Sequence, residues 1–361
     1  MLITTNAALA ELADRLGQSP EFGVDIEFER QSTYFPKLCL LQFATAQSAW
    51  CVDPLAPDLD LTVLRKPLCD PTIVKLFHSA RQDLEVFWWL WEELPSPVFD
   101  TQIAAAFLGF DLQIGLTSLV KACLEIELPP SEARSDWRRR PLSSEQLAYA
   151  AADVAHLCAL GTELRQRLNT AGRTAWHQAQ CAELLAPDLY APSLDSVWKR
   201  VKGSGRQNGL ALGRLQALAS WREQLARERD RPRQWILNDE SLVTIAERNP
   251  SSVSSLQAID GIPKKLIRAS GAELVSVVQD VTDAPEIDSS STRLGRAERE
   301  EAKKLLGSIR ALAEASEIAP GLLATRREVE RYVATRDREH LLRDWRHDLI
   351  ADLLDPTGIE V

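Results

Sequence analysis

The chain has 361 residues, more than one ordinary hydrophobic core accommodates, so its length predicts two or three domains. Hydrophobic residues make up 45% and charged residues 26% of it, which is a globular composition, and no apolar run approaches the roughly 18 residues of a membrane span. The first residues lack a basic segment followed by an apolar one, so we expect no secretory signal and a cytoplasmic protein.

The net charge of −10 is distributed unevenly along the chain. Residues 1–195 carry 15 basic and 26 acidic side chains, whereas residues 196–235 carry ten basic and three acidic ones. A basic segment joined to an acidic half suits a metal site coupled to a region that binds a polyanion. A solvated linker and helix face would explain the basic segment equally well.

After a helix expected over residues 6–15, the sequence FGVDIEFE at residues 22–29 alternates as a β-strand does. Its apolar side chains fall on one face, and Asp25 and Glu27 fall on the other, about 6.8 Å apart. Two like charges so close to a core are unfavourable unless a cation lies between them. Taken alone, the two acids also fit a half-buried strand whose polar face meets water.

Further short apolar runs predict strands at residues 38–45, 48–55 and 72–79, with another at Val98-Phe99. The first of these continue an antiparallel meander, and the run at 72–79 is almost entirely apolar, as in a central strand. Strands and helices alternate from there to residue 128. The order predicts an α/β domain with one mixed sheet flanked by helices.

A tryptophan-rich helix follows the strand at 72–79, and Ser79 and Gln82 have the spacing of a capping box at its start. Asp83 lies in its first turn, at the carboxyl end of a buried strand, where ligands bind in open α/β sheets. A carboxylate there also stabilises the helix dipole, so a purely structural role for Asp83 stays open.

A second capping box, Ser143 and Gln146, begins a long alanine-rich helix. Tyr149 and Asp153 are four residues apart on it and therefore share a face, about 6 Å from each other. Small side chains between them allow the helix to press closely on a sheet. We expect this approach to bring Asp153 to the acidic strand.

Four carboxylates and a tyrosine resemble the signature of the DEDDy group of 3′→5′ exonucleases: Asp25, Glu27, Asp83, Tyr149 and Asp153. The segments VDIEFERQSTYFPKLCLLQF, LFHSARQDLEVF and YAAADVAHL also stand in the order and spacing of that family. With its helical C-terminal region, the chain is similar to the ribonuclease D family over nearly its whole length. The resemblance implies an RNase H-like fold for the first domain.

The chemistry explains these residue types. Phosphodiester hydrolysis needs a nucleophile near neutral pH and neutralisation of charge on phosphorus, and two divalent ions about 3.5–4 Å apart supply both. Mg²⁺, or Mn²⁺ in its place, prefers oxygen ligands. The resemblance implies that Asp25 bridges two ions and that Glu27 and Asp153 complete the site of the attacking water. Asp83 would help to hold the other ion, and Tyr149 would orient the water, because a phenol with a pKa near 10 is a poor base.

A second set of residues, outside the proposed metal ligands, is expected to contact the substrate: Phe28, Thr33, Tyr34, Gln42, Trp137 and Arg140. The first four lie on or near the acidic strand and could line a slot for the terminal nucleotide. The last two precede the alanine-rich helix and could stack on a base or grip phosphates. Turn residues and surface charge explain them equally well. His78 is expected to be a hydrogen-bonded structural residue.

Short amphipathic helices separated by proline and glycine indicate a helical domain over residues 209–280. It resembles the HRDC module of RecQ-type helicases and ribonuclease D, a nucleic-acid-binding accessory, and its GIPKK turn would let Lys264 and Lys265 meet a phosphate. Residues 295–361 are interpreted as a second, diverged HRDC-like domain. A helical bundle that only braces the catalytic domain, residues 1–195, is the alternative.

These features together predict a monomeric, metal-dependent 3′→5′ exoribonuclease. It would trim structured RNA such as tRNA precursors and release nucleoside 5′-monophosphates. A 3′→5′ DNA exonuclease is an alternative, since no residue visibly reads a 2′-hydroxyl. A catalytically idle nucleic-acid-binding protein is another, although it would not need all four acids and the tyrosine.

Overall fold

The computed structural model describes residues 1–285, 294–339 and 341–354. The chain divides into two compact units, and each is described by itself. The first contains residues 1–29 and 36–187 together with the helices from residue 296 onward, and the second contains residues 30–35 and 188–295. Among the described residues, no helix combines the length and the apolar character that crossing a bilayer requires.

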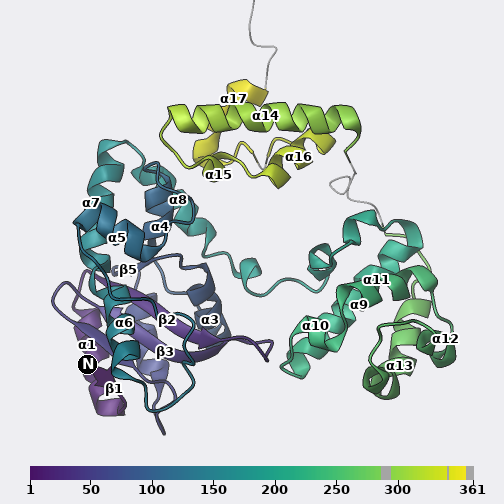
Figure 1. Cartoon of the computed structure of the whole chain (residues 1–361), viewed down its shortest axis with the longest axis horizontal. Coiled ribbons are helices and arrows are strands. Elements are labelled where there is room, and N and C mark those ends of the chain that lie inside the picture. The colour runs from purple at the N-terminus through teal and green to yellow at the C-terminus, as the bar shows by residue number, and fades with distance from the viewer. Residues whose placement is uncertain (286–293, 340, 355–361) are drawn as a thin grey trace, which may run out of the picture. The chain divides into compact units, whose positions relative to one another are not determined.

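A six-stranded mixed sheet forms the core of the first unit (Figure 1). Its strands lie in the order β1-β4-β3-β2-β5-β6, with β2, β3 and β4 antiparallel and the other pairs parallel. In chain order they span Leu2–Ile3, Glu21–Glu29, Lys37–Ala44, Ala49–Val52, Val74–Phe77 and Val98–Asp100. This topology confirms the predicted meander followed by alternating strands and helices. The short edge strand β1 was not predicted.

Helices cover the sheet and extend from it. They are α1 (Asn6–Gly17), α2 (Arg65–Cys69), α3 (Arg81–Trp91), α4 (Thr101–Ala106), α5 (Leu116–Leu124), α6 (Ser144–Ala155), α7 (Leu157–Thr170) and α8 (Thr174–Glu183). The C-terminal helices of this unit are α14 (Arg296–Ala315), α15 (Pro320–Leu323), α16 (Arg326–Thr335) and α17 (His347–Leu354).

The two predicted capping boxes have different outcomes. At α6 the box forms as expected, because the Ser143 hydroxyl accepts from the Gln146 amide and the Gln146 side chain accepts from the Ser143 amide. At α3 the prediction is wrong, since no side chain of the Ser79 region caps the helix. The Asp100 carboxylate instead accepts from the backbone amides of Ser79 and Ala80, at 3.2 and 2.8 Å. Asp100 therefore fixes the turn before α3, and its side chain also accepts from the Gln102 and Ile103 amides as the N-cap of α4.

Helix α6 approaches the sheet closely over β2 and β3. Ala150 is fully buried in a cluster with Leu40 and Cys51 of the sheet. A Cβ added at Gly23 of β2 would lie 3.0 Å from Leu157 Cβ and 3.1 Å from a backbone oxygen of α6. The absence of a side chain at Gly23 thus lets the junction of α6 and α7 rest directly on the strand that carries Asp25.

The C-terminal helices contact the helical side of the first unit. The Ala319 amide donates to the Ala106 carbonyl at 2.8 Å, and the Arg173 guanidinium donates to carbonyls of both Phe107 and Ser316. Trp345 stacks on Trp176 with ring centroids 5.4 Å apart. These contacts suit a bracing role for the C-terminal helices.

The second unit is helical. Its helices are α9 (Gly209–Glu228), α10 (Arg233–Ile236), α11 (Asp239–Arg248), α12 (Val253–Gln257) and α13 (Lys264–Gln279). Helices α10, α11 and α13 pack against the long α9. Glu223 of α9 is buried and forms ion pairs with Arg227 and Arg233. Amphipathic helices joined at proline and glycine are what the sequence predicts for this region.

Candidate active site

Strand β2 brings two carboxylates to the face of the sheet that α6 covers. Asp25 lies directly opposite Gln42 of β3, and Glu27 lies opposite Leu40. Leu40 packs against α6, so the alternation of the strand directs both acids toward that helix. The opposite face of β2 buries Val24 in the core.

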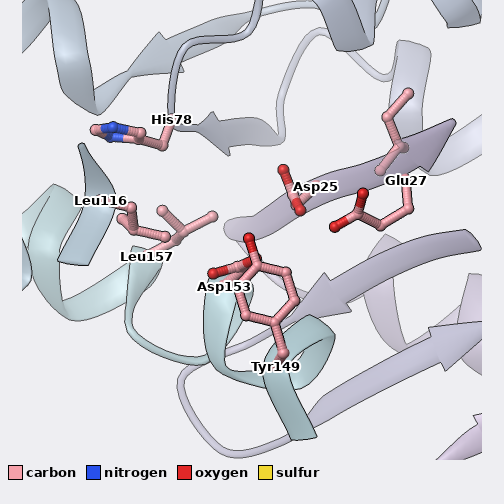
Figure 2. Close-up of a pocket in the computed structure, with 8 residues that line it drawn as sticks. Asp25, Glu27, His78, Leu116, Tyr149, Asp153 and Leu157 are labelled. Carbon is pink, nitrogen blue, oxygen red and sulfur yellow. The ribbon is translucent and has the colours of Figure 1, made fainter. Parts of the chain in front are cut away.

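Helix α6 supplies the other side of the site. Ligand oxygens of Asp25, Glu27 and Asp153 lie within 4.8 Å of one another, and all three residues are partly exposed. Figure 2 shows the three carboxylates pointing toward one another, with the Tyr149 ring beside Asp153. They line a pocket of about 180 Å³. The predicted delivery of Asp153 to the acidic strand is therefore observed.

Burial raises the pKa of all three carboxylates, and repulsion from neighbouring acids adds to the effect at Asp25 and Glu27. Burial, reinforced by the charge of Asp153, raises the pKa of Asp25 to about 8. Burial and the charges of Asp25 and Asp153 raise the pKa of Glu27 to about 9. The pKa of Asp153 rises to about 6 through burial, against the opposing effect of a hydrogen bond with Tyr149. Among the described residues, no basic side chain forms an ion pair with any of the three.

Tyr149 keeps its proton at neutral pH. Burial, followed by the charge of Asp153, raises the pKa of its phenol above the ordinary value. Its ring lies 6.2 Å, between centroids, from the buried ring of Trp137. A protonated phenol held in this way is a hydrogen-bond donor rather than a base.

Asp83 lies on α3 and is 7% exposed, outside the group formed by the other three acids. Burial and then the charges of Asp25 and Asp100 raise its pKa well above the ordinary value, and Glu27 adds to the effect. The fourth acid therefore shares the electrostatic field of the site, although its side chain does not line the pocket.

The donor set fits a hard divalent cation. Three carboxylates offer oxygen atoms within 4.8 Å of one another, and no histidine or cysteine belongs to the group. Oxygen ligands of this kind are those that Mg²⁺ and Mn²⁺ prefer. A bound cation would also supply the positive charge that the described side chains do not bring to these acids.

Three of the residues predicted to contact the substrate form hydrogen bonds with other parts of the protein. Tyr34 is buried in the second unit, where its hydroxyl donates to Glu223, and the Thr33 hydroxyl donates to the Phe35 carbonyl at 2.7 Å. Arg140 binds both carboxylate oxygens of Asp53 at 2.7 and 2.6 Å.

Three other candidates differ in their exposure. Gln42 and Trp137 are 0% and 4% exposed, and both are absent from the pocket lining. Phe28 is partly exposed on β2, one residue after Glu27.

In the second unit, Lys264 and Lys265 are exposed at the start of α13. Lys264 lines a pocket of about 460 Å³ together with Gly261 of the preceding turn and Arg268. The lining also includes Asp260, and its two basic side chains outnumber this one acid, which suits an anionic ligand.

The pocket also contains residues that the sequence did not single out for it. His78, Leu116 and Leu157 line it, as Figure 2 shows. The ring nitrogens of His78 lie 2.9 Å from Thr101 Oγ1 and 3.0 Å from the Ile114 carbonyl, which agrees with the expected hydrogen-bonded role. Its position at the carboxyl end of β5 was the available signal for a pocket residue. Leu116 carried no such signal.

Comparisons with known proteins agree with this geometry. The family model described as a 3′-5′ exonuclease matches residues 1–169, and that of the HRDC domain matches residues 211–278. Ribonuclease D of Gluconacetobacter diazotrophicus is 36% identical over 358 residues, covering 98% of this chain and 91% of the relative. Ribonuclease D of Zymomonas mobilis is 35% identical over 356 residues, covering 96% and 91%.

The crystal structure of Escherichia coli RNase D has the same fold, with a TM-score of 0.88 and 30% identity, and covers 99% of this chain and 97% of that one. This match confirms the predicted fold class, an RNase H-like mixed sheet flanked by helices and followed by helical domains. Identity above 30% extends over nearly the full length of both chains in the curated relatives. The chain therefore belongs to the ribonuclease D family and is a 3′→5′ exoribonuclease.

Proposed function

We propose that this exoribonuclease trims the 3′ ends of structured RNA, such as tRNA precursors, and releases nucleoside 5′-monophosphates. It would act in the cytoplasm as a monomer. The cluster of Asp25, Glu27 and Asp153 supports the proposal. The ligand oxygens of these three carboxylates lie within 4.8 Å of one another and their pKa values are raised, which suits a site for divalent cations. The similar Escherichia coli enzyme is described as an exoribonuclease involved in structured RNA processing.

Two divalent ions, Mg²⁺ or Mn²⁺, would be held by the four carboxylates, with Asp25 shared between them. When bound, such ions lower the pKa of water and neutralise charge on the phosphoryl group. Asp25, Glu27 and Asp153 would orient the reacting groups from two sides of the pocket. Asp83, buried behind them, would hold the side nearest the leaving oxygen.

Tyr149 would donate a hydrogen bond rather than accept a proton. Its raised pKa keeps the phenol protonated, and its hydrogen bond with Asp153 fixes the hydroxyl at the edge of the pocket. The hydroxyl would therefore orient the attacking water, while an ionised carboxylate accepts the proton.

The remaining candidates divide by their exposure. Phe28 stays a candidate contact for the terminal nucleotide, because it is partly exposed beside Glu27. Trp137 and Arg140 would serve the site by holding the segment before α6 in place, since one is buried and the other binds Asp53. Lys264 and Lys265 would contact RNA phosphates from an HRDC domain of residues 209–280. The other domains would be residues 1–195 and 295–361.

Matched RNA and DNA oligonucleotides, each with a structured 5′ part and a single-stranded 3′ end, test the proposal. With Mg²⁺ present, the RNA should shorten from its 3′ end and yield mononucleotides that carry a 5′-phosphate. Chelation should stop the reaction. Faster digestion of the DNA, or release of 3′-phosphates, would contradict it.

A further inference from the structure

Gln42, in the middle of β3, is fully buried with both polar atoms of its side chain unpaired. Its exposure is 0%, and neither Oε1 nor Nε2 has a hydrogen-bond partner among the described residues. Leaving a buried polar group unpaired costs about 1–3 kcal/mol. Native proteins contain few such groups, so this amide needs an explanation.

The sheet register places this amide beside the catalytic strand. Gln42 lies directly opposite Asp25 on one side and Cys51 on the other. Residues in such positions project to the same face, with Cβ atoms about 4.5–5.5 Å apart. Cys51 packs in one cluster with Ala150 of α6, so Gln42 also faces the helix that carries Asp153.

We propose that Gln42 is a positioning residue for Asp25. Its amide would donate a hydrogen bond to the neighbouring Asp25 carboxylate and so hold that side chain in the orientation that the site requires. Partners of metal-ligating carboxylates typically contribute 10–100-fold to metal affinity. The inference rests on the proposed metal site.

Gln42→Met tests the assignment because it keeps the volume of the side chain and removes the amide. The melting temperature of the metal-free variant should equal or exceed that of the wild type, since an unpaired buried group is lost. Its affinity for Mn²⁺, measured by calorimetry, should fall about 10–100-fold. The Mg²⁺ concentration that gives half-maximal activity should rise by the same factor.

Gln146→Met is the matched control. Gln146 is also buried, but its side chain is paired in the capping box of α6, so this substitution should lower the melting temperature. A lower melting temperature of Gln42→Met with unchanged Mn²⁺ affinity would assign Gln42 to packing and overturn the proposal. If the wild type binds no Mn²⁺, the proposed metal site itself fails.

A separate observation concerns the second unit. Trp235 of α10 is 60% exposed, whereas Trp221 of α9 is 6% exposed. Arg229 and Arg231 are also exposed and lie on the same segment, and neither forms an ion pair among the described residues, although the Arg231 guanidinium donates to the Ser32 carbonyl at 3.3 Å. Arg227 and Arg233, by contrast, are paired with Glu223. The exposed tryptophan therefore lies on the same segment as two arginines that form no ion pair among the described residues, with the acidic Glu228 and Asp230 next to them in the sequence.

The geometry points to a surface for single-stranded RNA, formed by Trp235, Arg229 and Arg231. A base would stack on the indole, and the two guanidinium groups would contact phosphates. Contact with a second copy of the chain is disfavoured, because a symmetric interface would bring the same arginines together.

Binding of a fluorescent single-stranded RNA to the Asp153→Asn variant, in which turnover is blocked, tests this surface. Adding Trp235→Ala should weaken binding about 5–100-fold, and adding Trp235→Phe should weaken it less. Replacing both Arg229 and Arg231 with Gln should lower the slope of log affinity against log salt by about two. Leu210→Ala, at another exposed apolar residue of the unit, is the control and should change nothing.

Unchanged affinity of the Trp235→Ala variant would overturn the RNA surface. A sedimentation change from dimer to monomer in that variant would assign the surface to a second copy instead. Because turnover is blocked in every variant, neither result depends on the proposed trimming activity.

Discussion

The acidic cluster of the first unit and a buried glutamate of the second have opposite electrostatic environments. In the first unit, Asp25 and Glu27 face Asp153 without a basic ion-pair partner among the described residues, and all three have raised pKa values. In the second unit, Glu223 is more deeply buried, at 1% exposure, but binds Arg233 and Arg227. Burial acts to raise its pKa, yet hydrogen bonds from Arg233 and Tyr34 hold it below the ordinary value.

The difference separates a structural carboxylate from a functional one. Glu223 is compensated by side chains that the same fold supplies, so it contributes to stability as the chain stands. Asp25, Glu27 and Asp153 repel one another, and only protons or an added cation relieve them. Repulsion of this kind is retained where it serves a metal site.

The largest expected effect is on turnover at the acidic site. Asp25→Asn removes a carboxylate shared by the proposed ions and should lower kcat at least about a thousand-fold, the order of effect of losing one transition-state stabilising group. Because the substitution also removes a repelling charge, the metal-free melting temperature at pH 8 should rise by about 2–4 °C, as for 1 kcal/mol in a domain of this size. Nucleotide release and thermal unfolding measure the two effects. A loss of both activity and stability would contradict the comparison.

Glu223→Gln should have the reverse pattern. It leaves Arg227 and Arg233 without their acid and should lower the free energy of unfolding of the second unit by about 3 kcal/mol, as measured in urea. Hydrolysis of a dinucleotide should change little by comparison, because the substitution leaves the acidic cluster intact. Unaltered stability would show that the arginines find other partners at no cost.

The metal-free protein should lose stability as the pH rises. In the folded chain the pKa values of Asp153, Asp25 and Glu27 are about 6, 8 and 9, whereas the unfolded values are about 4. Between these limits the folded state binds more protons than the unfolded state, so the free energy of unfolding falls as pH increases. Melting temperatures from pH 5 to 9 in a chelator should show this decline, and Mg²⁺ should reduce it. A melting temperature that does not change with pH would mean that the pKa values of these acids are not raised in the folded chain.

Tyr149→Phe should give the smallest effect. It removes one hydrogen bond at the edge of the pocket and keeps the ring packed near Trp137, so kcat should fall about tenfold with the melting temperature unchanged. Single-turnover rates on a short RNA would measure the loss. A rate equal to that of the wild type would remove the hydroxyl from the mechanism.

Local patterns in the sequence predict the parts of the site that depend on local rules. The alternation of β2 determines the common face of Asp25 and Glu27, and the spacing on α6 determines that of Tyr149 and Asp153. Both arrangements are present in the structure, as is the capping box that begins α6.

The sequence did not predict the hydrogen bonds between residues that lie far apart along the chain. Asp100 binds the backbone amides just before α3 from about 20 residues further along the chain, and Tyr34 donates to Glu223, 189 residues away. Neither partner is marked by a local pattern, because the distances close only when the chain folds. The same holds for Leu116, which reaches the pocket from a helix without a distinguishing motif.

Calorimetric titration of Mn²⁺ at pH 7, in two buffers of different ionisation enthalpy, tests the central claim most directly. At pH 7 the raised pKa values of Asp25 and Glu27 keep both side chains largely protonated. If these acids form the metal site, Mn²⁺ binding must displace their protons, and the wild type should release more than one proton per chain. Asp25→Asn should abolish most of the binding heat. Binding without proton release, or with the same heat in the variant, would contradict the account.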